Sequence, residues 1–566
     1  MVIDRTVGEG TMVTAAELLR QGKHTELWQM CCGFLSLNID EFMEVQQRHL
    51  MKQIELLSHS PLGKKLLRGA RPTTVSEFRE LVPLTTYKDY CPELLEKREE
   101  ALPVKPLLWA HSSGWSGDYT YKWVPITPAY ADELSRSLFG VGILSGAKCW
   151  GDVSHLPKNI NILYSVAPEP YISGIFADVL TMQSPINYLP SQEESKDMTF
   201  EERIRFGLKQ AMSRGFDYFF GISLVLVSVG EKISESSNKA SVRPFLKSPN
   251  ALWRLGRGKL RSRLAGRPML PRDLWKIRGI IGSGTDSLVY KNRIKEAWGR
   301  NPLDLYACTE GGVIAVQTWD YEGMSFVPNL NFLEFIPEDE QLKNQLDRSY
   351  QPKTLLLNEV KAGENYEIVI TNFHGGVVTR YRIGDMIKIT SLKNEKLGID
   401  IPQMAFERRV DDFIDFYVVI LTEKKIWQAI ESTGVPYQDW IAYKDAENLS
   451  LNIGIELKNG HQCDIEKVAA SIYQKLAYPN GDKSAESTHN DDLTDMADFG
   501  IKVDLLPSGT FASYIARRQA EGADLAHLKP PHINPSEKIL AMITAEAEET
   551  IVVTKSGVKN GSLVRY

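Results

Sequence analysis

A run of small, hydroxylated and glycine residues constrains the fold of this chain more than any other segment. Residues 107–109, Leu-Leu-Trp, are typical of the end of a buried strand, and residues 111–127 then read HSSGWSGDYTYKWVPIT. Glycines let backbone N–H groups turn toward an anion, and hydroxyl groups and a lysine add further donors. We therefore predict a loop that holds a polyphosphate. Its donors would be Ser112, Ser113, Gly114, Ser116, Gly117 and Lys122.

The spacing of this loop differs from that of the common nucleotide-binding motifs. The chain has no GxxxxGK[ST] sequence, and no GxGxxG follows a strand-like run, so P-loop and Rossmann folds are disfavoured. An ordinary Ser/Gly turn remains the alternative interpretation of the loop when it is taken alone.

Two later segments favour the nucleotide interpretation. In residues 305–312, LYACTEGG, Glu310 follows an apolar run, and its carboxylate is a candidate magnesium ligand. In residues 379–389, TRYRIGDMIKI, we expect Asp385 on a tight turn between two strands, where it can accept hydrogen bonds from both hydroxyls of a ribose. Each acid is also typical of a solvated loop or a turn. The three segments together favour a nucleotide site.

In these segments the chain resembles the auxin-responsive-promoter family of acyl-acid amido synthetases, a branch of the adenylate-forming enzymes. The family's first motif, SSGT(T/S)xG followed by Lys and Pro, is similar to residues 112–125. The second, Tyr-x-x-(Ser/Thr)-Glu, matches Tyr306, Thr309 and Glu310, and the third, Tyr-Arg-x-Gly-Asp, matches residues 381–385 without a change. Further similarity lies in residues 165–171, 284–286, 332–337 and 527–532.

The resemblance implies roles for these residues. The loop of residues 112–122 would bind the β- and γ-phosphates of ATP, Thr309 the α-phosphate and Glu310 a magnesium ion, while Lys529 would bridge the substrate carboxylate and the α-phosphate. The remaining ATP contacts would come from Gly284, Thr285, Asp286, Tyr306, Asp385 and Arg409. The acyl pocket would use Val166, Ala167, Pro168, Tyr171 and Ser173.

Two positions depart from the family pattern. Trp115 stands where the family has Thr, which removes a hydroxyl donor, and a hydrogen bond to a charged group is worth about 1.5–3 kcal/mol. His532 replaces the Arg of the terminal Gln-Tyr-Lys-x-Pro-Arg segment. We still expect an active enzyme.

The pattern and the resemblance together predict an α/β fold with two domains. Residues 1–405 would form a large ATP- and acyl-binding domain with mixed sheets and helices, and residues 413–566 a smaller, mobile α+β domain.

Residues 406–412, FERRVDD, carry five charges and favour a linker. They resemble the Gly-Arg-x-Asp-Asp hinge of the adenylate-forming enzymes, with Arg408 in place of the glycine. Since Lys529 lies beyond the hinge, the small domain would close over the nucleotide.

Periodicity predicts several elements. Residues 160–166, 277–283 and 366–371 are strand-like, and a capping box at Thr199 predicts a helix with Ile204, Leu208 and Met212 on one face. Residues 449–457 alternate apolar with polar or small residues and predict a half-buried strand, and Asp464 then opens a helix.

Composition excludes several classes of protein. A net charge of −6 and a pI near 6.0 give no reason to expect nucleic-acid binding. Six cysteines without a CxxC pair fit a reducing compartment, and neither a signal peptide nor an apolar run of about 20 residues is present, so we expect a cytoplasmic protein without a transmembrane segment.

A basic stretch stands apart from this acidic average. Residues 243–278 hold eleven Lys or Arg and one acid, Asp273, with tryptophans and leucines between them. A solvated helical surface is one interpretation. The other is contact with an anionic partner such as a membrane surface or the phosphates of coenzyme A.

The function predicted from these features is ATP-dependent activation of a small carboxylic acid as its acyl-adenylate, followed by transfer to an amino acid to form an amide. An acyl-CoA ligase would share the first half-reaction and deliver the acyl group to a thiol. A third alternative is a weakened nucleotide- or acyl-binding protein, which the departures at Trp115 and His532 would favour.

Overall fold

The computed structural model describes residues 13–112, 121–196, 198–235, 248–283, 287–347, 349–410, 413–415, 420–445, 450–477, 500–520, 530–535, 537–544, 549–554 and 557–560. The chain divides into two compact units. The first comprises residues 1–383 and 387–406, and the second comprises residues 384–386 and 407–566. The functional roles assigned to the two predicted domains remain predictions.

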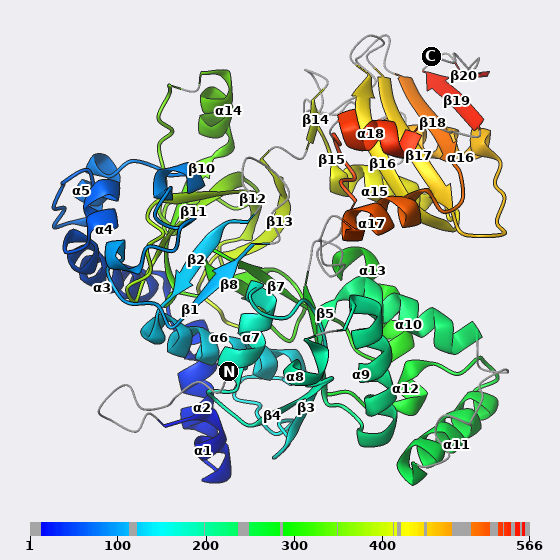
Figure 1. Cartoon of the computed structure of the whole chain (residues 1–566), viewed down its shortest axis with the longest axis horizontal. Coiled ribbons are helices and arrows are strands. Elements are labelled where there is room, and N and C mark those ends of the chain that lie inside the picture. The colour runs from blue at the N-terminus through cyan, green and yellow to red at the C-terminus, as the bar shows by residue number, and fades with distance from the viewer. Residues whose placement is uncertain are drawn as a thin grey trace. The chain divides into compact units, whose positions relative to one another are not determined.

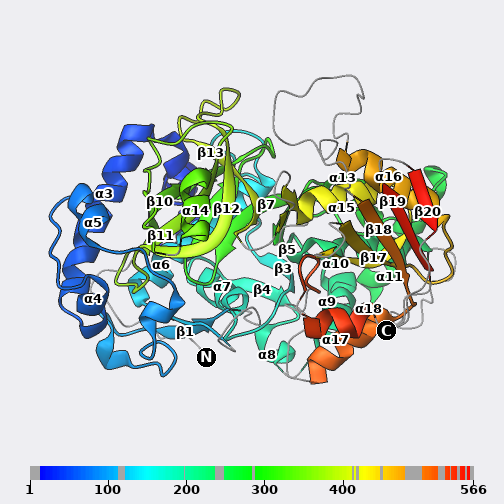
Figure 2. The same cartoon turned by 90° about the horizontal axis from the view of Figure 1, so that it is seen from above.

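The first hundred residues are mostly helical, as predicted. Helix α3 carries Leu50, Ile54 and Leu57 on one buried face, which packs with Phe332 and Phe373. Figures 1 and 2 show α3, α4 and α5 gathered beside the β10 edge of the large sheet. The helices of this region are α1 (Ala15–Arg20), α2 (His24–Cys32), η1 (Gly33–Ser36), α3 (Ile39–Ser58), α4 (Pro61–Leu66), α5 (Val75–Leu81), η2 (Tyr87–Tyr90) and η3 (Glu99–Ala101).

Among the described residues, a small hairpin of β1 (Leu108–His111) and β2 (Trp123–Ile126) precedes an eleven-stranded mixed sheet. The sheet has the order β10-β11-β12-β13-β9-β8-β7-β6-β5-β3-β4. Neighbours from β4 to β7 pair in parallel, and the pairing turns antiparallel from β7 to β8. The strands are β3 (Ile160–Ser165), β4 (Ile186–Leu189), β5 (Tyr218–Ile222), β6 (Gly279–Ser283), β7 (Leu303–Cys308), β8 (Gly312–Gln317), β9 (Met324–Phe326), β10 (Asn331–Pro337), β11 (Asn365–Asn372), β12 (Tyr381–Ser391) and β13 (Gln403–Arg409).

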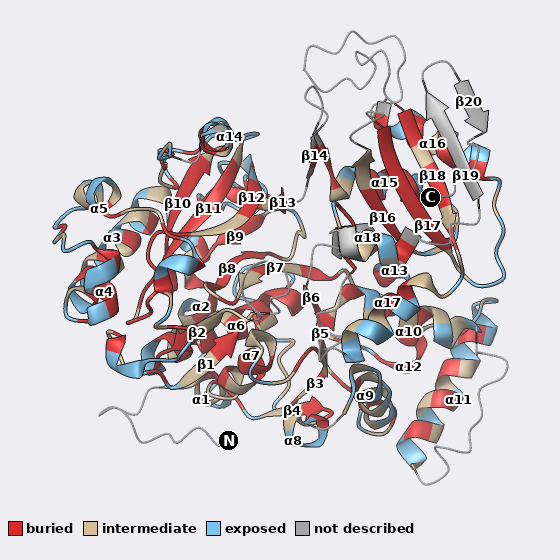
Figure 3. Cartoon of the chain, turned by 45° about the horizontal axis from the view of Figure 1, so that its top comes forward, coloured by how far each residue is buried: buried red, intermediate tan, exposed pale blue. Residues whose placement is uncertain are grey.

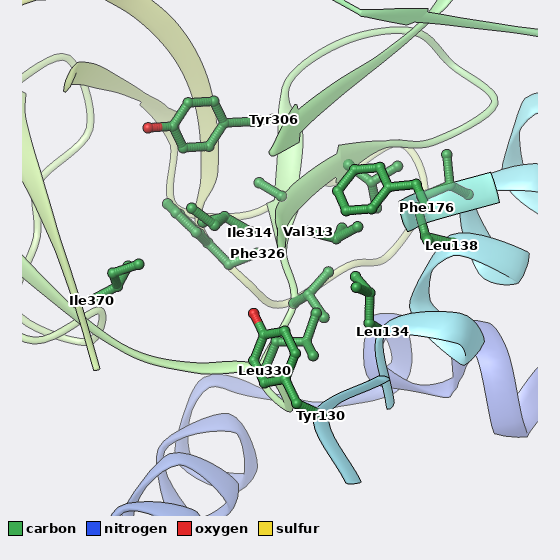
Figure 4. Close-up of a cluster of buried hydrophobic side chains, with 14 of the residues drawn as sticks. Tyr130, Leu134, Leu138, Phe176, Tyr306, Val313, Ile314, Phe326, Leu330 and Ile370 are labelled. Carbon is green, nitrogen blue, oxygen red and sulfur yellow. The ribbon is translucent and has the colours of Figure 1, made fainter. Parts of the chain in front are cut away.

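Helices cover this sheet and complete the α/β body that the alternation of elements predicted. Figure 4 shows Leu134 and Leu138 of α6 and Phe176 of α7 packed near Val313 and Ile314 of β8, and all five belong to one buried core or pack in it. The remaining helices of this part of the chain are α6 (Pro128–Gly146), α7 (Ile172–Leu180), α8 (Gln192–Ser195), α9 (Phe200–Arg214), α10 (Ser223–Glu235), α11 (Pro249–Leu264), α12 (Pro271–Leu274), α13 (Ser287–Trp298) and α14 (Glu338–Leu346).

Helix α9 begins at the predicted capping box, and its apolar face is buried only in part. Thr199 and Glu202 exchange hydrogen bonds with each other's backbone as expected. Met212 is buried as the pattern suggests, but Ile204 and Leu208 are only half-buried, and the other buried positions are Arg203, Gly207 and Ala211. A Cβ at Gly207 would lie 2.6 Å from the carbonyl oxygen of Leu189, so the missing side chain is what lets this face approach β4.

The second unit contains a five-stranded sheet of order β16-β17-β18-β19-β20 among its described residues, with a separate β14-β15 pair. Figure 3 shows that β16, β17 and β18 are largely buried. Its elements are β14 (Phe413–Asp415), β15 (Ile420–Thr422), α15 (Glu423–Ser432), β16 (Tyr437–Asp445), β17 (Ser450–Leu457), α16 (Ile465–Ala477), β18 (Gly500–Leu506), α17 (Thr510–Ala520), α18 (Glu537–Thr544), β19 (Glu549–Thr554) and β20 (Gly557–Asn560).

Strand β17 is buried on both faces, so the prediction of a half-buried strand is wrong. Its polar positions are covered as well as its apolar ones, and Glu456 is only 3% exposed. The Glu456 carboxylate accepts from the N–H groups of Gly509 (2.6 Å) and Phe511 (2.8 Å) at the start of α17. The alternation of apolar and polar residues therefore identified a strand, but it did not show that another part of the chain covers the polar face.

The first part of the charged stretch of residues 406–412 belongs to a strand, because β13 continues to Arg409. Arg408 is buried, with 4% of its surface exposed, and its guanidinium donates to the carbonyl oxygens of Arg409 and Val410. Asp411 and Asp412 lie outside the described residues. In the part of the chain that the structure describes, no helix is long and apolar enough to cross a membrane.

Candidate functional site

The predicted phosphate loop connects the two strands of the β1–β2 hairpin. The N–H of Ser112 donates to the carbonyl oxygen of Lys122 at 3.0 Å, where the strands end. The strand before the loop exists, but it is not buried as predicted, since Leu107 is 36% exposed. The hairpin forms a sheet of its own rather than a strand of the large sheet. Four of the predicted donors lie outside the described residues: Ser113, Gly114, Ser116 and Gly117.

His111, which sequence reasoning missed, ties this hairpin to the predicted acyl segment. Its N–H donates to the carbonyl oxygen of Pro170 at 3.0 Å, and its ring centroid lies 4.3 Å from that of Tyr171 and 4.2 Å from that of Tyr121. Burial lowers the pKa of His111, so the ring is neutral near pH 7. The β1–β2 hairpin and Tyr171 are therefore neighbours.

Residues 85–90 connect the same hairpin to the third motif. Tyr87 Oη accepts from the N–H of Trp123 at 2.6 Å, and Thr85 pairs with β12 through the N–H of Arg382 (3.0 Å). Tyr90 packs edge-on against Tyr381, with their ring centroids 6.0 Å apart. Nothing in residues 85–90 marks this role in the sequence.

Three predicted segments follow the carboxyl ends of parallel strands in the sheet. Residues 166–173 follow β3, residues 284–286 follow β6, and residues 309–310 follow β7. Ligands of open α/β sheets bind outside these strand ends. Gly284, Thr285 and Asp286 themselves lie outside the described residues.

Glu310 is held between the second and third motifs. Tyr381 Oη donates to Glu310 Oε1 at 3.1 Å, and the Asn372 side chain donates to the Glu310 carbonyl oxygen at 2.8 Å. Burial and the nearby Glu310 carboxylate raise the pKa of Tyr381 well above its usual value, so its hydroxyl stays a donor. Thr309 is buried, with 8% exposed, and Tyr306 lies in the core with its ring centroid 6.2 Å from that of Phe406.

Two arginines of the third segment fix the start of β12. Arg380 forms a two-pronged ion pair with Glu334, at 2.8 and 3.0 Å, and both side chains are almost fully buried. Arg382 does the same with Glu367, at 2.6 and 2.8 Å. Planar guanidinium groups suit this geometry, which restricts where Tyr381 can point.

Asp385 lies within strand β12 and not on a tight turn, which corrects the sequence prediction. Gly384 has a φ of +81°, so the strand bends without breaking there. Asp385 is 8% exposed and forms an ion pair with Arg409, with Nε and Oδ1 3.1 Å apart. Two of the predicted ATP-binding residues thus contact each other, and both belong to the second unit.

The predicted acyl residues shape the turn between β3 and α7. Val166 and Ala167 are buried, and the Ser173 hydroxyl donates to the Ala167 carbonyl oxygen at 3.0 Å. A Cβ at Gly174 would lie 2.1 Å from the backbone nitrogen of Glu169, so this turn requires glycine.

An apolar cavity of about 50 Å³ lies between α6, α7 and the sheet. None of the five predicted acyl residues lines it, but Tyr164 does, and its hydroxyl donates to the carbonyl oxygen of Ser173. Tyr218 also lines the cavity, and its buried hydroxyl has no hydrogen-bond partner among the residues that the structure describes. The wall is otherwise almost wholly aliphatic and aromatic: Leu138, Phe139, Val141, Gly142, Leu156, Ile160, Ile162, Phe176, Ala177, Leu180, Ile186, Tyr188, Phe220 and Ile281.

Lys529 lies outside the described residues, but the segment that follows it is firmly placed. Ile533 pairs in parallel with Ala442 of β16. His532 is buried, with Nδ1 2.6 Å from Glu423 Oε1 and Nε2 2.7 Å from Asp439 Oδ1, and its ring stacks on Trp440 at 4.4 Å. The two ring nitrogens of His532 thus connect α15 and β16 through one buried side chain.

Known proteins bear out the fold and the resemblance. Residues 324–409 match the GH3 family central domain. A 4-substituted benzoates-glutamate ligase of Arabidopsis thaliana is 25% identical over 259 residues, which is 41% of this chain and 39% of that protein. Part of the chain is thus similar to GH3 acyl-acid amido synthetases. A jasmonoyl–L-amino acid synthetase of Nicotiana attenuata is 26% identical over 239 residues, 40% of this chain and 38% of that protein. The matches span less than half the length of these curated relatives.

Solved GH3 structures share the fold over nearly the whole chain. An acyl acid amido synthetase in complex with 2,4-DB superposes with a TM-score of 0.60 at 13% identity, covering 93% of this chain and 96% of that one. A 2-hydroxyisobutyryl-CoA ligase in complex with 2-HIB-AMP superposes with a TM-score of 0.56 at 13% identity, covering 88% and 90%. The predicted α/β fold with mixed sheets is confirmed.

Proposed function

We propose that this protein uses ATP to activate a small carboxylic acid as its acyl-adenylate and transfers the acyl group to an amino acid. A carboxylate oxygen attacks the α-phosphorus, and the bond to pyrophosphate breaks. The amine nitrogen then attacks the acyl carbon, AMP leaves, and the amine loses a proton. Alignment and charge neutralisation are the main tasks of the protein in such a reaction.

The hydrogen bond between Tyr381 and Glu310 carries this proposal, because it joins the second and third motifs at one point. The strand ends of β3, β6 and β7 provide the general location that an α/β sheet offers a ligand. The loop of the β1–β2 hairpin would bind the β- and γ-phosphates through Ser112, Ser113, Gly114, Ser116, Gly117 and Lys122. Thr309 would hold the α-phosphate and Asp385 the ribose, while Lys529 would bridge the two reacting groups.

Glu310 fits a magnesium ion of the kind that binds with a nucleotide. Such an ion takes one or two carboxylates and completes its shell with phosphate oxygens and water. No cluster of three or more metal-binding side chains occurs among the described residues, so a closed protein site is not the arrangement here. When bound, the ion would neutralise phosphate charge. Tyr381 would meanwhile hold the Glu310 carboxylate in place.

The cavity beside α7 would take the apolar part of the acid. Its wall is apolar, and Tyr164 connects it to Ser173 of the predicted acyl segment. Its volume of about 50 Å³ suits a small group, since one water needs roughly 10–15 Å³ by the same measure. Tyr218 would offer a hydrogen bond to a polar atom of that group. We therefore expect short branched or single-ring acids to be preferred over long-chain acids.

Acid-dependent pyrophosphate exchange across a panel of aryl and aliphatic acids tests the proposal. The wild-type protein should exchange pyrophosphate with some acids, and Glu310→Gln should lower the rate by about 100-fold or more. Glu322→Gln is the matched control, because that acid is exposed and pairs with Lys396. Absence of exchange with every acid, or an equal rate in both variants, would contradict the proposal.

The acceptor is tested on the same adenylate. Amino acids and coenzyme A are supplied in parallel, and the products are analysed by mass spectrometry. We expect an amide, and a thioester would instead establish a CoA ligase.

Lys529→Ala should abolish exchange while ATP binding persists, and unchanged exchange would remove Lys529 from the mechanism.

A further inference from the structure

Helix α11 (Pro249–Leu264) presents two opposite faces, of which only one is covered. Ala251, Leu255 and Gly258 lie on the covered face with Ser262, and a Cβ at Gly258 would come within 2.7 Å of Leu274 of α12. These positions follow the spacing i, i+4, i+7 and i+11, which defines one stripe of a helix. This stripe is explained by packing against the rest of the first unit.

The opposite stripe is apolar and exposed. Trp253, Leu260 and Leu264 are 63%, 60% and 80% exposed, and they share the spacing i, i+7 and i+11. Figure 3 shows exposed and buried stretches alternating around α11 at the edge of the unit. Three large apolar side chains in a row on one helix face are uncommon on a surface that faces only water.

Basic residues line both sides of this exposed stripe. Helical geometry places Lys259 and Arg263 on one side and Arg257 and Arg261 on the other. The helix contains no acid at all. The Arg257 guanidinium lies 4.8 Å from the Trp253 ring, so charge and apolar surface are side by side. Two arginines of the helix are partly engaged within the unit: Arg254 donates to the carbonyl oxygens of Ala211 and Met212, and Arg257 donates to that of Leu274 at 3.1 Å. Lys259, Arg261 and Arg263 are therefore the principal charges beside the stripe.

We propose that α11 is a docking surface for an anionic lipid bilayer, which goes beyond the proposed function and does not depend on it. A helix with an apolar stripe between rows of Lys and Arg lies in the plane of the membrane interface, where indole rings also concentrate. Its basic residues attract anionic headgroups, while its Trp and Leu side chains enter the acyl boundary. Nucleic acid would use the charges but would leave the apolar stripe exposed, so the stripe favours lipid.

Vesicle co-sedimentation of the full chain tests this surface. The wild-type protein should bind phosphatidylcholine vesicles with about 30% phosphatidylserine at least tenfold more tightly than pure phosphatidylcholine vesicles, and salt near 0.5 M should remove most of that binding.

Arg261→Gln with Arg263→Gln should weaken binding about 25-fold, at about fivefold per charge. Trp253→Ser with Leu260→Ser and Leu264→Ser should weaken it at least tenfold. Thermal unfolding and acid-dependent exchange should be unchanged in both variants, which separates this result from any failure of the proposed function.

Leu392→Ser is the matched control, because Leu392 is an exposed leucine (46%) on another part of the first unit. It should bind vesicles as the wild-type protein does. No binding to the anionic vesicles, or full binding by the triple serine variant, would overturn the proposal. Binding to a DNA duplex that the serine substitutions do not weaken would assign the surface to nucleic acid instead. Self-association lost in the serine variant, without vesicle binding, would assign it to a second copy of the chain.

Discussion

Single residues decide the chemistry that the site can support. Glu310 has a fixed neighbour in Tyr381, Asp385 has one in Arg409, and the buried hydroxyl of Tyr218 has no partner among the described residues. A buried hydroxyl without a hydrogen bond costs free energy, and a polar atom of a ligand in the cavity would remove that cost. The sequence identified the two acids because they lie in motifs. It could not identify Tyr218, because a tyrosine in a strand is an ordinary core residue.

One pair of acids predicts how stability depends on pH. Burial, with the Glu169 carboxyl beside it, raises the pKa of Asp178 to about 8. Between its usual pKa near 4 and this value the folded state binds more protons than the unfolded state, so this group's contribution to stability falls as pH rises through that window. Asp178→Asn should therefore have a higher Tm than the wild-type protein at pH 8, and the difference should shrink or reverse near pH 4.

Thermal unfolding between pH 4 and pH 9 measures this difference. The control is Glu193→Gln, an exposed acid on the neighbouring helix α8, which should follow the wild-type curve. A Tm difference for Asp178→Asn that stays constant with pH would show that Asp178 is not protonated in the folded protein.

Secondary-structure elements show what local pattern can and cannot specify. Caps and periods located α9, α16, β3, β6 and β11 close to their observed bounds, because these signals are local. The same signals did not show which positions of α9 are buried most deeply, and they predicted a half-buried β17. In both cases the decisive contact comes from elsewhere in the chain: Leu189 against Gly207, and the start of α17 against Glu456.

Helix α6 offers a matched pair of glycines. A Cβ at Gly142 would meet nothing within 4 Å, whereas a Cβ at Gly140 would lie 2.4 Å from the carbonyl oxygen of Cys31. Gly142→Ala should raise the free energy of unfolding by about 0.5–1 kcal/mol, because alanine restricts the unfolded chain and favours the helix. Gly140→Ala should lower it, since the backbone must move. Urea denaturation measures both, and equal effects of the two substitutions would contradict the packing of α6 against α2.

The segment after Lys529 depends on His532 for its anchorage. His532→Ala removes both charge-assisted hydrogen bonds, and the second unit should lose about 1–3 kcal/mol of stability. His532→Arg supplies nitrogen donors for the same two carboxylates, so it should retain most of that stability. Tryptophan fluorescence during urea unfolding reports the effect, because Trp427 and Trp440 pack on this ring. An unaltered midpoint in the alanine variant would remove the anchoring role.

At the scale of the whole molecule, ligand binding should be coupled to stability. ATP at about 100 times its Kd should add about 2.7 kcal/mol to the free energy of unfolding. Asp385→Ala should lose most of this gain, because the ribose contact is gone. The same substitution should change the stability of the free protein by no more than about 1 kcal/mol, since Arg409 is half-exposed and stays hydrated.

Thermal unfolding with and without ATP measures this coupling, with Glu322→Ala as the control on an exposed acid. An equal ATP-dependent rise of Tm in the Asp385 variant and the control would overturn the ribose assignment.

The sequence alone determined the class of fold, the order of the motifs and the residue types at the proposed nucleotide site, because each depends on short segments whose spacing can be counted. The tertiary structure decided that β12 passes through Asp385 without a turn, that β13 absorbs the charged stretch as far as Arg409, and that an apolar cavity lies beside α7. Burial and cavity shape arise from side chains that lie on different elements of the chain, and no local pattern encodes which of them will meet.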